Sequence, residues 1–390
     1  MITIRRQLLG LGFAAASSLV AMHAAHALTG PTAITIDGGP LGSLSLSGGV
    51  DGYAYAVTQT NSNQQTVGAN IASALVQLQK TTGVLQFNIE VGANSGLTLG
   101  APGYDARGHI PETSINNFDT GPLFIGSITV APPNSPVTIT AGHIASLEGY
   151  EGTIDWVNPS QLSTDIFYVQ NNNATGVQAN ITEGPITAEV QFGDGFDTGV
   201  WNFAQALVTY TIDSNNVVNV YGAANLGRTG LNAHTYAQDT VGEYGSYYIN
   251  SDMIGGFYSW TQGNLNIVPE VQYVFAKVDH QAGIDKSTSN LGAAVFGTYA
   301  FANTPYSLGG WVEYENSQGN ADWFVGPHSE AVGVALSPTW QYKDLFARAN
   351  AGAIYLLNNS ASGPGTAYGY GNNGTGKFQF TGTLEAGLLF

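Results

Sequence analysis

The sequence contains no cysteine, so neither disulfide bonds nor thiolate metal sites can hold its fold together. Charged residues make up only 9% of the chain, whereas typical soluble domains have about 25%. Beyond the N-terminal segment no run of about 18 uninterrupted apolar residues occurs, which argues against a transmembrane helix there. The composition therefore excludes a disulfide scaffold and disfavours both a soluble domain and a helical membrane protein.

Basic residues are also few. The chain holds 10 Lys and Arg against 27 Asp and Glu, and its formal charge is −17. Such an acidic chain makes nucleic acid an implausible partner and cations more natural guests. An alternative is that acidic loops serve solubility or bind divalent ions at a lipopolysaccharide surface.

The N-terminus has the pattern of a secretory signal. Arg5 and Arg6 precede a largely apolar segment, and Ala25-His26-Ala27 fits a small-residue cleavage site. We therefore expect residues 1–27 to be a cleaved signal peptide, 28–42 a short periplasmic lead-in, and 43–390 a single membrane domain. Export without a helical anchor leaves the periplasm, the extracellular space or a membrane β-barrel.

The C-terminus alternates apolar and polar residues and ends on Phe390. Such alternation predicts a strand with one apolar and one wet face. A final strand that ends on an aromatic residue is typical of the closing strand of an outer-membrane barrel, although soluble β proteins also end on strands. We expect the apolar face, with Phe380, Leu388 and Phe390, to act as an assembly signal recognised by the barrel-assembly machinery.

Connections along the chain alternate between tight turns and long polar loops. This asymmetry is typical of short periplasmic turns and long extracellular loops in membrane barrels. Seven turns and eight loops predict an all-β, antiparallel up-and-down transmembrane barrel of about 16 strands, within a range of 14–18. The turns fall at 81–83, 132–135, 183–185, 214–215, 263–264, 303–305 and 343–344, and the loops at 59–66, 95–120, 145–174, 195–199, 227–247, 279–289, 317–329 and 358–376.

A barrel of this size encloses a lumen that side chains alone do not fill. The two longest loops, 95–120 and 145–174, are the candidates to fold inward and narrow it. Opposed charges at a constriction would set ion preference, although each could equally be an ordinary solvated loop charge. The constriction candidates are Asp105, Arg107, His109, Glu112, Glu148, Glu151 and Asp155.

Five short motifs occur in order between residues 139 and 197: Thr140-Ala141-Gly142-His143-Ile144, Leu147-Glu148-Gly149-Tyr150-Glu151, Asn158-Pro159, Thr175-Gly176-Val177 and Gly193-Asp194-Gly195-Phe196-Asp197. Their order resembles the β-barrel porin-2 family of Gram-negative outer membranes. The chain departs from that pattern at His143, where a Lys is usual, and at Asp194 and Phe196, which replace Asn and Trp. The resemblance implies a diffusion channel without assigning its solute.

The pattern predicts a porin in a Gram-negative outer membrane, passing small hydrophilic solutes or ions with a weak cation preference. We expect lipid and lipopolysaccharide as partners, no cofactor, no metal and no catalysis; a homo-oligomer stays open. A surface adhesin or structural barrel would look nearly identical in sequence. A barrel hydrolase is disfavoured, because no Gly-x-Ser-x-Gly elbow occurs and the histidines are scattered.

Overall fold

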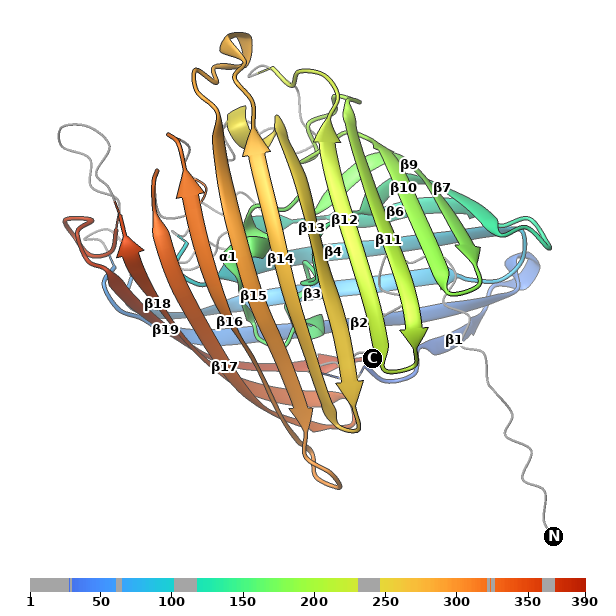
Figure 1. Cartoon of the computed structure of the whole chain (residues 1–390). Coiled ribbons are helices and arrows are strands. Elements are labelled where there is room, and N and C mark those ends of the chain that lie inside the picture. The colour runs from blue at the N-terminus through green and yellow to red at the C-terminus, as the bar shows by residue number, and fades with distance from the viewer. Residues whose placement is uncertain are drawn as a thin grey trace.

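The chain forms a closed antiparallel β-barrel of 16 strands, as the turn and loop pattern predicts. This computed structural model describes residues 28, 30–60, 65–101, 118–230, 246–320, 323, 327–359 and 369–390. The ring closes where the last strand pairs with the first barrel strand, with Leu384 opposite Ala54. Figure 1 shows strands of the front and back walls crossing, as tilted strands of a barrel do.

The barrel wall follows the order of the chain. Its strands are β2 (Ser43–Val57), β3 (Val67–Lys80), β4 (Leu85–Thr98), β6 (Leu123–Val130), β7 (Val137–Ala145), β9 (Asn173–Glu183), β10 (Ile186–Gly193), β11 (Phe203–Asp213), β12 (Asn216–Asn225), β13 (Ser251–Gln262), β14 (Leu265–Ala276), β15 (Thr288–Ala300), β16 (Tyr306–Gln318), β17 (Glu330–Tyr342), β18 (Leu345–Asn358) and β19 (Phe378–Leu389). Short β5 (Phe118–Thr120) also pairs with β4.

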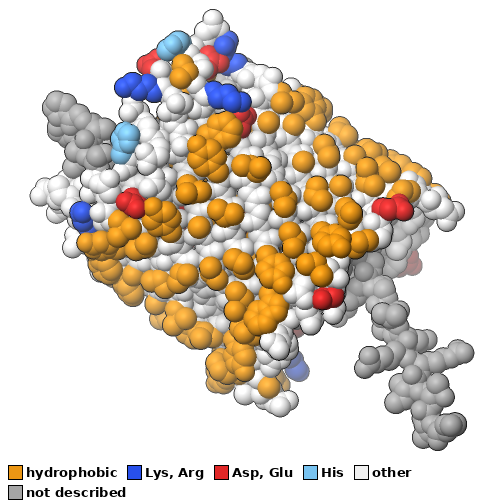
Figure 2. All heavy atoms as spheres, viewed as in Figure 1, with side chains coloured by type: hydrophobic (Ala, Val, Ile, Leu, Met, Phe, Trp, Pro, Cys, Tyr) orange, Lys and Arg blue, Asp and Glu red, His pale blue; other side chains and the backbone are white. Residues whose placement is uncertain are grey.

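Strand residues alternate between an apolar outer face and a more polar inner face. On β19, Leu384 is 68% exposed whereas Glu385 is 3% exposed. Val190 and Gln191 on β10 alternate in the same way. Figure 2 shows apolar side chains spread over the strands, with charged side chains gathered mainly at the loop end. This arrangement suits a wall between lipid and a polar lumen.

All seven predicted turns and all eight predicted loops separate consecutive barrel strands. The turns are tight because residues at their centres adopt left-handed backbone, as at Gly184, Gly263 and Lys343. None of the described helices is both long and apolar enough to cross a membrane. The segments that can fill the lumen are therefore the longest connections between barrel strands.

Residues 28–42, which we expect to be a short lead-in, contain β1 (Ile34–Asp37), which pairs with β2, and η2 (Gly39–Leu41). Trp311 and Tyr248 are buried inside the barrel. Trp311 points inward because it lies on the same face of β16 as Glu313.

Candidate functional site

Residues 146–172, here called the inward loop, connect β7 and β9 and lie inside the barrel (Figure 1). The loop contains η3 (Asp155–Val157), β8 (Leu162–Ser163) and α1 (Asp165–Tyr168). β8 pairs in parallel with β4. Further hydrogen bonds reach inward-facing side chains on β11, β14, β16 and β18, as at Gln205, Gln272 and Asn350. The loop therefore spans the lumen and is attached on several sides.

Glycines in the family-like motifs let the strands that carry this loop pack closely. Gly142, Gly176 and Gly193 are register partners across β7, β9 and β10. A Cβ on Gly142 would lie 2.2 Å from a neighbouring carbonyl oxygen, and a Cβ on Gly193 2.3 Å from another. Gly142 also has φ +136°, which side chains rarely adopt. The motif glycines thus serve backbone approach next to the base of the loop.

An apolar cluster fixes the inward loop to the wall. The Tyr150 ring packs edge-on against Phe257 and at a tilt against Phe296, with ring centroids 5.7 Å and 4.8 Å away. Trp311 Nε1 donates to the carbonyl oxygen of Leu162 at 2.7 Å. Buried aromatic pairs of this kind contribute about 0.5–1.5 kcal/mol beyond their buried area. The loop is therefore a packed structural element and not a solvated strap.

Glu148 and Glu151 lie on this loop, and both are 6% exposed. Glu148 Oε2 accepts from the Asn171 amide at 2.8 Å, and Glu151 Oε2 accepts from the Thr164 amide at 3.0 Å. The other oxygen of each carboxyl accepts no hydrogen bond from described residues. Burial raises the pKa of each to about 8. These two groups therefore change charge near neutral pH.

A cavity of about 140 Å³ lies between the inward loop and the wall of β3, β4 and β6. Its polar lining includes Gln77, Asn88, Glu90, Glu148 and Glu151. Phe124, Ile125 and Phe257 line other parts of the cavity. Polar groups that line a pore can replace part of the hydration shell of a small cation. Two of the predicted constriction residues, Glu148 and Glu151, thus line the same cavity as the Glu90 carboxyl on the wall strand β4.

Further acids face the loop from the wall. Glu270 on β14 and Glu313 and Glu315 on β16 are buried, and Glu313 Oε2 accepts from the amide of Asp165 at 2.9 Å. Neither carboxylate oxygen of Asp165 accepts a hydrogen bond from described residues. Burial raises the pKa of Asp165 well above its usual range, helped by Glu313 and Glu315. The two-residue spacing of Glu313 and Glu315 on an alternating strand is the signal that could have found them.

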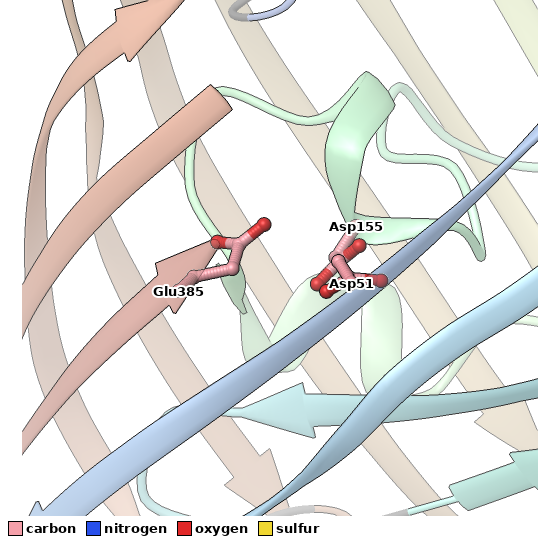
Figure 3. A group of neighbouring side chains, drawn as sticks. All are labelled: Asp51, Asp155 and Glu385. Carbon is pink, nitrogen blue, oxygen red and sulfur yellow. The ribbon is translucent and has the colours of Figure 1, made fainter. Parts of the chain in front are cut away.

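Asp155, the third predicted loop acid, lies apart from Glu148 and Glu151. It comes close to Asp51 on β2 and Glu385 on β19, and their nearest carboxylate oxygens lie within 4.8 Å of one another (Figure 3). Arg348 on β18 donates from Nε to Glu385 Oε2 at 2.7 Å. Burial raises the pKa of Asp155 to about 7.

Four predicted constriction residues, Asp105, Arg107, His109 and Glu112, lie outside the described residues. At the C-terminus, Phe380 and Leu388 are exposed on the outer face. Phe390 exchanges two backbone hydrogen bonds with Gly48 on β2, at 2.8 and 2.9 Å. The terminal residue therefore completes the pairing of the last strand with the first barrel strand.

The residues at which the chain departs from the family pattern have structural roles. Asp194 accepts from the backbone amides of Thr175 and Gly199 at 2.5 and 2.9 Å, which fixes the loop after β10. His143 Nδ1 lies 3.5 Å from Asp197 and 3.4 Å from the hydroxyl of Thr175. An imidazole does not carry the fixed positive charge of a lysine.

A closed barrel narrowed by an inward loop has a porin-like fold, and the comparisons agree. The family model described as "Putative beta-barrel porin-2, OmpL-like" matches residues 43–390. The chain belongs to this family. The match begins at the first residue of β2. No curated protein sequence matches the chain.

Solved porin structures share the fold at low identity. An anion-selective porin from Comamonas acidovorans is 11% identical with a TM-score of 0.56, covering 89% of this chain and 99% of that one. The channel DcaP of Acinetobacter baumannii is 10% identical with a TM-score of 0.55, covering 89% and 97%. Salmonella typhi OmpF in complex with daunomycin is 12% identical with a TM-score of 0.53, covering 92% and 100%. These likenesses establish the fold alone.

Proposed function

We propose that this protein is an outer-membrane porin that passes small hydrophilic solutes and ions by diffusion and prefers cations. The main support for the cation preference is the sign of the charge on the buried side chains. Among the buried charged side chains of the described part of the chain, Arg348 is the one base. The acids are Asp51, Glu90, Glu148, Glu151, Asp155, Asp165, Glu189, Asp194, Asp252, Glu270, Glu313, Glu315 and Glu385.

Charge of one sign around a narrow, low-dielectric passage raises the local concentration of counter-ions. The inward loop narrows the passage, and Glu90, Glu148 and Glu151 line its side cavity. We therefore expect the solutes that pass through the channel to be small. The Comamonas neighbour is described as anion-selective, but side chains and not the barrel fold decide selectivity.

The proposal assigns no catalysis, since no Gly-x-Ser-x-Gly elbow occurs in the sequence. It takes lipid, lipopolysaccharide and the assembly machinery as partners in the outer membrane.

The test is a reversal-potential measurement on the purified barrel in a planar bilayer under a KCl gradient at about pH 9, where Glu148 and Glu151 are mostly ionised. We expect a potential of the sign that K⁺ selectivity produces. The paired variant Glu148→Lys/Glu151→Lys should move it toward zero or reverse it, whereas Asp285→Lys, on the exposed loop, should not. An anion-selective wild type would refute the cation preference. Correctly folded protein without conductance would instead favour an adhesin or structural barrel.

A further inference from the structure

We infer that Asp51, Asp155 and Glu385 bind one calcium ion that joins the inward loop to the seam of the barrel. The three carboxyls come from β2, η3 and β19, which are far apart in the sequence. β2 and β19 are the strands whose pairing closes the ring. Figure 3 shows the three side chains converging on one region.

The geometry fits a hard divalent cation. One oxygen from each carboxyl lies within 4.8 Å of the others. Oxygens bound to one Ca²⁺ at about 2.3–2.6 Å are at most about 5 Å apart. Mg²⁺ requires shorter distances and a near-ideal octahedron, which three side chains on separate elements are less suited to form. The all-oxygen donor set also disfavours softer metals.

Hydrogen bonds orient two of the carboxyls and leave one oxygen of each without a donor. Asp51 Oδ1 accepts from the amide of Ser73 at 3.0 Å, and Asp155 Oδ2 accepts from Gln161 Nε2 at 3.0 Å. The remaining oxygens, Asp51 Oδ2 and Asp155 Oδ1, are buried and accept no hydrogen bond from described residues. Ligand carboxylates are characteristically fixed in this way by outer hydrogen bonds. Besides the short distances between the carboxyls, these two buried oxygens without a hydrogen-bond donor therefore point to a bound ligand.

The net negative charge of the group around these carboxyls also favours a bound cation. Three carboxyls face one guanidinium, that of Arg348, whose Nε and Nη2 donate to Glu385. Fully ionised, the group carries two uncompensated negative charges in a buried place, which is costly without a counter-ion. Glu385 keeps free lone pairs for a metal, since a carboxylate has about four acceptor sites.

The competing explanation is a proton shared among the carboxyls. Burial raises the pKa of Asp155 to about 7, helped by Glu385. A shared proton responds to pH and not to calcium, whereas a bound ion responds to calcium at constant pH, so calcium titrations at a fixed pH separate the two explanations.

The experiment uses the full-length folded barrel in detergent at pH 8, stripped with chelator. Terbium replaces calcium as a luminescent probe, and Trp156, next to Asp155 in the chain, is the expected sensitiser. We expect saturable terbium emission that calcium displaces better than magnesium. Asp155→Asn should weaken binding about tenfold or more. Asp344→Asn, in the exposed turn before β18, should leave it unchanged.

Calcium should also raise the unfolding midpoint of the wild type, because the ion binds only the folded seam. This measurement keeps the test valid if Asp51→Asn does not fold. Absence of saturable terbium binding to wild type, or equal binding by Asp155→Asn and wild type, would overturn the proposal. An unfolding midpoint that responds to pH but not to calcium would assign the group to a shared proton and overturn it as well.

Discussion

Arg348 on β18 and Glu385 on β19 stand opposite each other in the strand register and form two hydrogen bonds, at 2.7 and 3.1 Å. Both side chains are fully buried. Arg348 also donates to the backbone oxygens of Asn158 and Asp155 at 3.0 and 3.2 Å. A single guanidinium therefore links two neighbouring wall strands to the inward loop.

Replacing Arg348 by Met should destabilise the barrel strongly. The substitution leaves the Glu385 carboxylate buried without its partner, and breaking a buried pair in this way costs about 3–5 kcal/mol. The double variant Arg348→Met/Glu385→Leu should lose less, because it removes the Glu385 carboxylate together with its partner, while Asp51 and Asp155 remain in both variants. Urea unfolding in detergent, followed by tryptophan fluorescence, measures both. Equal losses in the single and double variants would show that the ion pair itself is not what matters.

Arginine on the outer face should be more harmful than arginine on the open part of the inner face. Val190→Arg and Leu384→Arg each place a charge toward lipid, at a cost of about 2–4 kcal/mol near the bilayer midplane. Asn180 is an inner-face position that is only half-buried, so Asn180→Arg stays hydrated. Thr383 is unsuitable as the comparison because it is buried and donates to Gln161 of the loop at 2.6 Å. Unfolding midpoints in lipid vesicles compare the variants, and equal midpoints would refute the assignment of faces.

Deleting Phe390 should impair assembly more than a comparable change in a loop. The deletion removes two backbone hydrogen bonds to Gly48 at the ring closure. Unpaired backbone groups at a strand edge in lipid cost several kcal/mol each. The amount of heat-modifiable barrel in outer membranes measures assembly, with deletion of exposed Lys286, in the loop before β15, as the control. Wild-type levels in the Phe390 deletion would contradict the prediction.

The strand order could be predicted because it depends on local chemistry. Residues such as Gly184 and Gly263 set tight turns wherever they occur, and two-residue alternation fixes the outer face of each strand. β1 is not predictable in this way, because its four residues, Ile34–Asp37, form no longer alternating pattern.

The site was less predictable because its members meet only in three dimensions. The sequence identified Glu148, Glu151 and Asp155 as loop acids, but the wall decides their partners. Asp51 and Glu385 come from opposite ends of the chain and become neighbours only when the ring closes. Spacing rules for metal ligands apply within one element or loop. No pattern along the chain could therefore have joined these three carboxyls.

Cation preference should increase as the pH rises from about 6 to about 9. Burial raises the pKa of Glu148 and of Glu151 to about 8. Both carboxyls are therefore mostly neutral at pH 6 and mostly ionised at pH 9, where they attract cations to the cavity that they line. A protonated carboxyl is neutral, so raising the pH adds negative charge and increases the preference for cations. Reversal potentials under one KCl gradient, measured across this range, give the dependence.

The matched variant is Glu148→Gln/Glu151→Gln, which keeps the shape of both side chains and removes their titration. Its reversal potential should change much less between pH 6 and pH 9 than that of the wild type, and its cation preference should stay at or below the wild-type value at pH 6. Asp285→Asn, on the exposed loop, should titrate like the wild type because its 84% exposed side chain is screened by solvent. If the double variant kept the full pH dependence, the titrating groups would lie elsewhere in the lumen, and these two loop carboxyls would not govern selectivity.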